Sequence, residues 1–322
     1  MRLMTRIIAC IAATLVAATS ASAQSWPTKP VKIIVPFTAG SATDILARTF
    51  GQKLQEAWGQ PVVIENHPGA GGTIGAGLVA KAAPDGYTLL VHSAGFAVNP
   101  YIYPHLSYDS QKDFTPIAAL GGQPNVLVVS PASNIRTVAD LIALAKQKPG
   151  ALNYGSAGQG SGTHINAEKF KRAAHIDAVH VPYKGTPEAL TDTVAGRINY
   201  FFSPISAALP QLKEGKLVAL GVSSSKRSSV LKDVPTLAES GLPGFDYNLW
   251  VGLFGPAGMP ADLVERMNRD IARLAQTPEL RERFATLGAE PMPMSPAEFR
   301  KFVGAEMETS AQIVKAAGIK AQ

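Results

Sequence analysis

The sequence has very little cysteine and only one long apolar run. Cys10 is the single cysteine among 322 residues, and it lies inside the apolar run of residues 7–18. That run is too short to span a bilayer, and no second apolar segment of about 20 residues follows it. A membrane-spanning chain is therefore not expected.

The first residues instead have the composition of a secretory signal peptide. Arg2 and Arg6 precede the apolar run, and Ala21-Ser22-Ala23 is a small-residue cleavage pattern. We expect a signal peptide over residues 1–23, with Gln24 as the first residue of an exported chain. Its removal takes away the only cysteine, so the mature chain has no disulfide, thiolate nucleophile or cysteine metal ligand.

Motifs for several enzyme classes are also missing. The sequence contains no Gly-Lys-Ser/Thr of a Walker loop and no Gly-x-Ser-x-Gly nucleophile elbow. Residues 69–75 partly match a dinucleotide fingerprint, but the strand expected at 87–93 does not end in the acidic residue that holds a ribose. No two of the six histidines are four residues apart. We therefore expect neither a metal nor a cofactor.

Charge is sparse and nearly balanced. Charged residues make up 17% of the chain, and the formal net charge is +6, which loss of Arg2 and Arg6 lowers by two to +4. The excess is scattered, with Lys226-Arg227 the only adjacent basic pair in an expected loop. Nucleic acid is therefore not expected as a partner, whereas a mildly basic surface favours anionic solutes.

Short β-branched runs alternate with amphipathic segments along most of the chain. Strands expected at 31–35, 61–66 and 87–93 are separated by helices, which gives a βαβαβ order. A second set of such units runs through residues 137–222. This order is typical of mainly parallel sheets with helices on their faces, and the length favours two domains over one.

The connection between the halves is expected near residues 121–124. Two apolar runs, 115–120 and 126–130, flank Gly121-Gly122-Gln123-Pro124, which we interpret as a break between two strands and a hinge. After a last strand at 250–254 the chain is expected to be helical, at 261–276, 278–287 and 296–317. Since helices alone cannot complete such a domain, we expect them to pack on the first half.

Four loops follow expected strands and precede expected helices. They comprise residues 37–43, 67–72, 156–162 and 183–186. Ligands of open parallel sheets lie beyond the carboxyl ends of the strands, where such loops meet. Because helix N-termini carry free N–H groups that favour anions, two facing lobes would bring these loops together around a carboxylate.

Some polar residues near the loops have two interpretations. Asp44, three residues after Ser41, fits a capping box, and it would alternatively bind the amine of an amino acid. His164 either touches a ligand or serves as a cap or core side chain. Lys184 either pairs with an anion or lies in solvent, and Trp250 is expected in the core rather than in a cleft wall.

Several stretches of the mature chain form a specific set. They are Pro36-Phe37-Thr38-Ala39-Gly40 with Asp44 and Arg48, residues 65–72, residues 83–87, residues 156–161 with His164 and Glu168, residues 181–185, and Gly255-Pro256-Ala257-Gly258. Each is weak alone, but in this order they resemble the Bug-type extracytoplasmic solute receptors of tripartite tricarboxylate transporters. The resemblance covers essentially the whole mature chain.

The resemblance implies a periplasmic binding protein rather than an enzyme. Its fold would be α/β with two lobes (a Venus flytrap), each lobe a mainly parallel sheet flanked by helices. It would hold a carboxylate in the interlobe cleft and deliver it to a two-subunit membrane permease. Resemblance and loop positions together give this candidate ligand-binding set: Phe37, Thr38, Ala39, Gly40, Ser41, Asp44, Gly69, Ala70, Ser93, Ser156, Ala157, Gly158, Ser161, His164, Tyr183, Lys184 and Ser203.

Two positions depart from the family pattern. Ser41 stands where the first loop has a second Gly, and Ser203 stands where many relatives have an Asp directed toward an amine or used to position a loop. The loss of that carboxylate favours a di- or tricarboxylate or an aromatic carboxylate over an amino acid.

We expect lobe 1 to comprise residues 24–122 and 248–322 and lobe 2 residues 123–247, with closure about the Gly122 and Gly244 regions. The protein is expected to act as a monomer. Two alternatives remain open: a receptor that presents its ligand to a sensor kinase, and a periplasmic hydrolase that uses Ser161 and His164.

Overall fold

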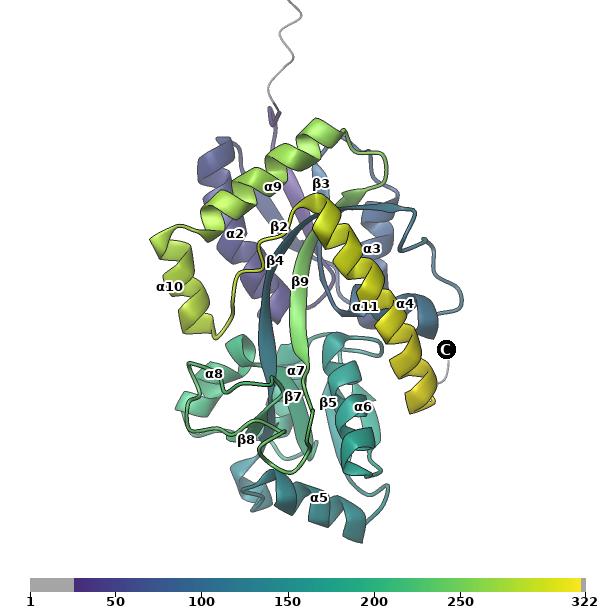
Figure 1. Ribbon diagram of the computed structural model, residues 1–322, viewed down its shortest axis with the longest axis vertical. Coiled ribbons are helices and arrows are strands. Elements are labelled where there is room, and N and C mark those ends of the chain that lie inside the picture. Colours follow the sequence, from purple (N-terminus) through teal and green to yellow (C-terminus); the bar gives the residue numbers. More distant parts are fainter. Residues whose placement is uncertain (1–25, 320–322) are drawn as a thin grey trace, which may run out of the picture.

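The computed structural model describes residues 26–319 (Figure 1). The expected signal peptide and its cleavage before Gln24 lie outside the described residues. Between Trp26 and Ile319, no helix is both long enough and apolar enough to cross a membrane.

The first half of the molecule is built on a mixed sheet. Strands β1, β2 and β3 are parallel, and β9 joins them by pairing antiparallel with β3. The strands are β1 (Val31–Val35), β2 (Val62–Asn66), β3 (Thr88–Ser93) and β9 (Asn248–Pro256). The helices of this half are α2 (Ala42–Trp58), α3 (Thr73–Ala80), α4 (Gly95–Ile102), α9 (Ala261–Ala275), α10 (Pro278–Leu287) and α11 (Pro296–Ala317), with the short turn η1 (Ala70–Gly72).

The second half repeats the alternation of strands and helices. Strand β5 pairs parallel with β6 and β7. The strands are β5 (Asn153–Ser156), β6 (Val179–Pro182), β7 (Tyr200–Pro204) and β8 (Val218–Val222). The helices are α5 (Val138–Gln147), α6 (Gly162–Ala174), α7 (Thr186–Val194) and α8 (Ile205–Lys213), with the turn η2 (Pro131–Ser133) after β4.

One long strand, β4 (Phe114–Val129), runs through both halves (Figure 1). Its first part pairs antiparallel with β9, from Phe114 to Pro124, and its last part pairs antiparallel with β7 and β8. The overall order is β2-β1-β3-β9-β4-β7-β5-β6, with β8 also on β4. The antiparallel pairs all involve β4 or β9, so the sheets are mixed.

The predicted break at residues 121–124 is therefore wrong. Gly121 and Gly122 continue the strand because β9 pairs with them, and they are glycines because other side chains pack on them. A Cβ at Gly121 would lie 2.5 Å from Cε1 of Phe284, and one at Gly122 would lie 2.9 Å from Sδ of Met292. Gly244 lies before the β4–β9 pair, next to Phe245 in the core of the second half.

The C-terminal helices pack on the first half, as predicted. Met267, Ile271 and Phe284 of α9 and α10 join the core formed with β1 and α2. Phe299 and Met307 of α11 lie in the core on the other face, which also contains Trp250. Trp250 is thus a core residue, and its indole N–H donates to Glu306 at 2.8 Å.

Candidate functional site

The four predicted loops meet between the two halves. From the first half, Gly71 lies so close to the 156–161 loop that a Cβ on it would be 2.0 Å from the carbonyl oxygen of Gln159. Gly185 of the second half approaches the first loop equally closely, since its Cβ would lie 1.8 Å from Oγ1 of Thr38. Its φ of −171° is ordinary extended backbone, so the close approach, not backbone strain, requires glycine there. The halves are therefore closed on each other.

The loops enclose a small cavity. Its volume is about 20 Å³, which is room for about one water molecule. It is lined by Phe37, Ser41, Ala42, Thr43, Ser93, Ala157, Ser161, Gly162, Thr163, Thr186, Pro204 and Leu249. None of these side chains is charged, and six carry a hydroxyl group. A solute larger than water therefore enters when the two halves separate, and the loops and lining side chains shift to hold it when they close.

Three helices begin at this cavity. The N-caps of α2, α6 and α7 are Ser41, Ser161 and Gly185, and the residues that follow each of them line the cavity. The N–H groups of Ala42 and Thr43 donate to no acceptor within residues 26–319, and the same part of the chain offers no partner to the buried Thr43 hydroxyl. Free N–H groups at helix N-termini are well suited to bind an anion.

Direct hydrogen bonds join the halves around the cavity. The Thr38 hydroxyl donates to Glu188 at 3.0 Å, and the backbone N–H of Thr186 donates to the Ser41 hydroxyl at 3.2 Å. On the other side, the Tyr103 hydroxyl donates to the carbonyl of Gln159 at 3.0 Å. These bonds stabilise the closed arrangement.

Asp44 supports the first loop from behind rather than lining the cavity. The predicted capping box is wrong, because the Ser41 side chain caps no N–H of α2 and the Asp44 carboxylate accepts from the Gly40 N–H instead, at 2.9 Å. Arg48 and Asn66 also donate to that carboxylate. Burial alone would raise the pKa of Asp44, but these hydrogen bonds lower it below its ordinary value.

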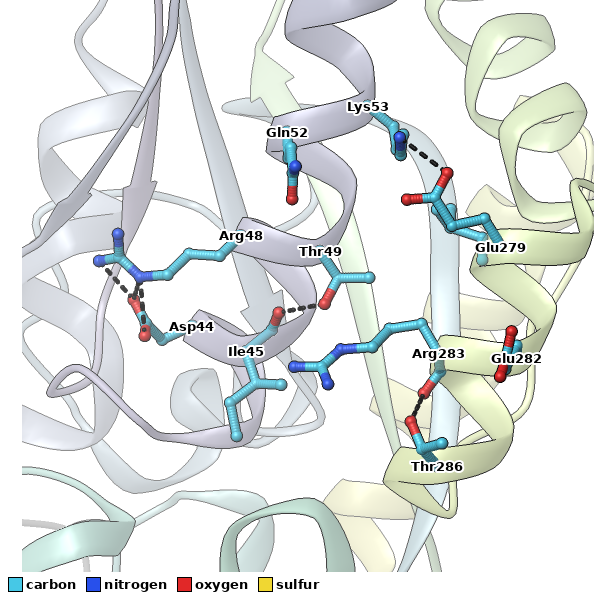
Figure 2. Close-up of a pocket in the computed structure, with 11 residues that line it drawn as sticks. Asp44, Ile45, Arg48, Thr49, Gln52, Lys53, Glu279, Glu282, Arg283 and Thr286 are labelled. Atoms are coloured by element: carbon cyan, nitrogen blue, oxygen red, sulfur yellow. Dashed lines mark hydrogen bonds and ion pairs between the residues drawn. The ribbon is translucent and has the colours of Figure 1, made fainter.

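A larger groove lies outside the loops, between α2 and α10 (Figure 2). Its volume is about 540 Å³. Arg48, Lys53 and Arg283 line it together with three carboxylates, Asp44, Glu279 and Glu282, so its formal charges cancel. Figure 2 shows Arg48 paired with Asp44 and Lys53 paired with Glu279. The first turn of α10 also lines this groove, but its Leu280 N–H donates to the Thr277 hydroxyl, whereas Ala42 and Thr43 at the cavity have N–H groups that are free within the described chain. We therefore place the candidate site at the cavity.

The structure brings together part of the predicted ligand-binding set. Phe37, Ser41, Ser93, Ala157 and Ser161 line the cavity. The other predicted residues are not among those that line it: Thr38, Ala39, Gly40, Asp44, Gly69, Ala70, Ser156, Gly158, His164, Tyr183, Lys184 and Ser203. Three of the four predicted loops contribute lining residues, and the loop of residues 67–72 contributes none.

Several of those remaining side chains are held by other partners. The Tyr183 hydroxyl donates to Asp192 at 2.6 Å, and Lys184 is exposed. Ser203 is fully buried in β7, where its hydroxyl donates to the carbonyl of Pro204 at 3.1 Å. The Ser156 hydroxyl is 2.6 Å from Nε2 of His180.

Sequence reasoning missed seven lining residues. They are Ala42, Thr43, Gly162, Thr163, Thr186, Pro204 and Leu249. The first five occupy the first turns of α2, α6 and α7, which the general preference of helix N-termini for anions could have identified. Leu249 and Pro204 have no local signal, because only the pairing of β4 with β9 and β7 brings them to the cavity.

The cavity has no pair of side chains arranged for nucleophilic catalysis. The Ser161 hydroxyl accepts from the His164 backbone N–H and lies 3.0 Å from the Thr163 hydroxyl, while Nδ1 of His164 accepts from the Gly160 N–H. A serine nucleophile requires a base at hydrogen-bond distance. Within residues 26–319, no group of three or more His, Cys, Asp and Glu side chains is placed to hold a metal ion.

Comparison with known sequences identifies relatives over most of the chain. Residues 46–319 match the family described as "Tripartite tricarboxylate transporter family receptor". BugT of Bordetella pertussis is 36% identical over 322 residues, which cover 98% of this chain and 99% of BugT. A Pseudomonas sp. strain P51 protein from the tcbD-tcbE intergenic region is 38% identical over 82% of this chain and 79% of its own length.

Solved structures of two-lobe binding proteins have the same fold. An R. palustris protein solved with adipate superposes with a TM-score of 0.90 at 36% identity, covering 92% of this chain and 100% of that one. The periplasmic binding protein BugD has a TM-score of 0.87 at 31% identity, with 92% and 100% covered. MatC of Rhodopseudomonas palustris with bound malate has a TM-score of 0.85 at 35% identity, with 90% and 100% covered.

These findings confirm the predicted two-lobe α/β fold and the expectation of a binding protein rather than an enzyme. The chain belongs to the Bug-type receptor family of tripartite tricarboxylate transporters.

Proposed function

We propose that this receptor captures a small carboxylate in the cavity between its lobes and delivers it to a two-subunit membrane permease of the tripartite type. The observation that carries the proposal is the meeting of three helix N-termini and six hydroxyl-bearing residues at one uncharged cavity. Charge-assisted hydrogen bonds from N–H and O–H groups bind a carboxylate without an Arg or Lys. Two similar structures, one with adipate and one with bound malate, support the same class of ligand.

The ligand is a di- or tricarboxylate or an aromatic carboxylate without an amine. No carboxylate among residues 26–319 lines the cavity to pair with an ammonium group, and Ser203 stands at the position where the family pattern often has Asp. Phe37, Pro204 and Leu249 provide apolar surface for the carbon skeleton. The remaining predicted ligand residues, among them Thr38, Gly69 and Gly158, belong to the loops that close over the solute.

The receptor acts in the periplasm as a monomer, after removal of residues 1–23. Lobe 1 comprises residues 24–122 and 248–322, and lobe 2 comprises residues 123–247. The lobes share strand β4, which in the described chain pairs with β9 in lobe 1 and with β7 and β8 in lobe 2. Bending of β4 between these two pairings opens the cleft, and the Thr38–Glu188 and Ser41–Thr186 hydrogen bonds form when it closes.

A thermal-shift screen of the chain from Gln24 onward tests the ligand class. Adipate, malate, citrate, benzoate, glutamate and a neutral amide form the panel. A ligand at a hundred times its dissociation constant stabilises the folded state by about 2.7 kcal/mol. We expect the carboxylates that lack an amine to raise the midpoint of thermal unfolding. The proposal is contradicted if none of them raises the midpoint, or if only the amide does.

A pair of variants on the same helix tests the location. Thr43→Val removes a hydroxyl from the cavity. Thr49→Val removes a hydroxyl that donates to the Ile45 carbonyl and lines the larger groove between α2 and α10. We expect the first to weaken carboxylate binding by about tenfold and the second to leave it unchanged. Equal effects of both variants would place the ligand elsewhere.

The partner requires a separate experiment. The loaded receptor is added to vesicles that contain the two-subunit permease, and uptake of labelled solute is measured. Uptake that depends on the receptor supports delivery. Stimulation of a sensor kinase by the loaded receptor, without uptake, would favour the alternative of a receptor that presents its ligand to a kinase.

A further inference from the structure

Two histidine side chains hold the 156–161 loop from inside lobe 2. Nδ1 of His164 accepts the backbone N–H of Gly160 at 3.1 Å. Nε2 of His180 is 2.6 Å from the hydroxyl of Ser156, and that hydroxyl accepts the N–H of Gly158 at 3.0 Å. The backbone N–H of Gly160 is therefore held directly by an imidazole, and that of Gly158 is held by an imidazole through the Ser156 hydroxyl.

This loop is one of the parts of lobe 2 that contact lobe 1. The Gln159 carbonyl accepts the Tyr103 hydroxyl, and a Cβ on Gly160 would lie 2.7 Å from Oδ1 of Asn99 in α4. Ala157 and Ser161, at either end of the loop, line the cavity. A shift of the loop by a few tenths of an ångström therefore changes both the lobe contact and the cavity.

The two imidazoles lie in a buried aromatic stack. Their ring centroids are 4.1 Å apart with an interplanar angle of 17°, and the Tyr154 ring stacks on the His180 ring at 5.0 Å. His164 is 3% exposed. Such a site disfavours charge on either ring.

The titratable groups around this stack come from three elements. Tyr154 of β5, Tyr200 of β7, and Glu168 and Lys171 of α6 surround it, and Glu168 accepts from both Tyr154 and Lys171. Burial and, to a lesser degree, the charge of Lys171 lower the pKa of His164 to about 4. Burial, His164 and Lys171 lower the pKa of His180 to about 3, although Glu168 opposes them.

We infer that His164 and His180 are positioning residues of the ligand site, and that the neutral imidazole of His164 is required to keep the 156–161 loop in its binding conformation. The inference rests on the proposed function, since it concerns the affinity of the same cavity.

The chemistry of the two ring states explains the requirement. Neutral His164 carries its proton on Nε2, so that Nδ1 is free to accept from Gly160. Protonation places a hydrogen on Nδ1, and two donors then face each other. The Gly160 N–H loses its acceptor, and the loop moves to find another. Acidification should therefore weaken carboxylate binding through the receptor itself.

Three substitutions distinguish this role from simple core packing. His164→Asn keeps an acceptor near the Nδ1 position and does not titrate, whereas His164→Leu removes the acceptor. His175→Asn, at the exposed C-cap of the same helix, is the matched control, because Asn also tolerates its left-handed conformation.

The first measurement uses the receptor without ligand. Amide hydrogen exchange of Gly160 is followed at pH 7 in the wild type and the three variants. We expect about tenfold faster exchange in His164→Leu and wild-type protection in His164→Asn and His175→Asn. Equal protection in all four proteins would overturn the inference. This result does not depend on which solute binds.

The second measurement is the dissociation constant of adipate between pH 7 and pH 3, a range that extends below the pKa of about 4 for His164, expressed as the ratio of wild type to His164→Asn at each pH. The ratio cancels protonation of adipate itself. We expect it to rise about tenfold per pH unit below the pKa of His164. A ratio that stays constant overturns the pH dependence.

If no carboxylate of the panel binds any of the proteins, the proposed function fails. The exchange of the Gly160 amide then still decides whether His164 positions the loop. Failure of the inference and failure of the proposed function are thus separate results.

Discussion

The backbone N–H of Thr186 donates to the hydroxyl of Ser41 across the cleft, at 3.2 Å. Both residues belong to the first turns of helices that begin at the cavity, but the helices come from different lobes. The Ser41 hydroxyl caps no N–H of its own helix, which leaves it available for this contact. A residue that departs from the family pattern is therefore part of the closed structure.

Ser41→Ala should weaken the binding of adipate by about tenfold. In the closed state the buried Thr186 N–H would lose its acceptor, which costs about 1–3 kcal/mol, whereas in the open state water replaces the hydroxyl. The free energy of unfolding in urea should therefore change little. Isothermal titration measures the affinity, with Ser229→Ala in an exposed loop as the control.

Gly185→Ala should block closure of the lobes. The added Cβ would overlap Oγ1 of Thr38 in the closed state, while the extended backbone at residue 185 accepts alanine without strain. We expect adipate to bind at least about tenfold more weakly, since each 1.4 kcal/mol of steric cost is a factor of ten. Small-angle scattering with adipate present should give the radius of gyration of the open form.

Gly304→Ala in α11 is the matched control for that variant. No atom outside its immediate surroundings lies within 4 Å of the added Cβ. Alanine in the middle of a helix should stabilise the fold by up to about 1 kcal/mol. If Gly304→Ala and Gly185→Ala weaken adipate binding equally, closure is not the cause.

Asp44→Ala should destabilise the protein and weaken its ligand affinity together. The carboxylate holds the Gly40 N–H, Asn66 and Arg48, and the side chain is 4% exposed while that of Arg48 is 50% exposed. Because Arg48 can turn to solvent, we expect a loss of about 2 kcal/mol rather than the larger cost of stranding a buried charge. Urea unfolding measures this loss of unfolding free energy. A loss below about 0.5 kcal/mol would show that Asp44 does not support the loop.

Stability should fall as the pH drops from about 6.5 to 4. Burial lowers the pKa of His92 and of His164 to about 4, against an ordinary value of 6.5. Above pH 6.5 these two histidines are neutral in both the folded and the unfolded state. Between the two values only the unfolded state takes up a proton, so each histidine reduces the free energy of unfolding by about 1.4 kcal/mol per pH unit.

Urea unfolding at half-unit pH intervals measures this slope. His164→Asn removes one titrating group, so its slope between pH 6 and pH 4.5 should be lower by about 1.4 kcal/mol per pH unit. The exposed His175 serves as the control, since His175→Asn should keep the wild-type slope. An unchanged slope in His164→Asn would contradict the lowered pKa.

Local signals in the sequence predicted most elements of the fold. Thr137 and Asp140 form a capping box, whose two partners lie in one helical turn. The pattern of Ser41 and Asp44 is similar but does not form one, because Arg48, Asn66 and the Gly40 N–H bind the carboxylate first. A local motif fails where residues from another element compete for the same side chain.

Nonlocal pairing explains the remaining errors. The sequence near Gly122 is typical of a break, yet β9, more than a hundred residues away, continues the strand through it. The same distinction holds at the candidate cavity. Its loops can be predicted from the order of strands and helices, whereas Leu249 and Pro204 reach it only because β9 and β7 pair with β4.

Strand β4 supplies side chains to the hydrophobic cores of both lobes. Ile117 and Leu120 lie in the core with α2 and α9, and Leu127 and Val129 lie in the core of lobe 2. A single proteolytic cut within this strand would therefore damage both lobes at once, whereas cuts in the exposed loops would leave both cores intact. Because β4 is paired along its length, first with β9 and then with β7 and β8, a protease reaches it only after the sheet of one lobe has opened.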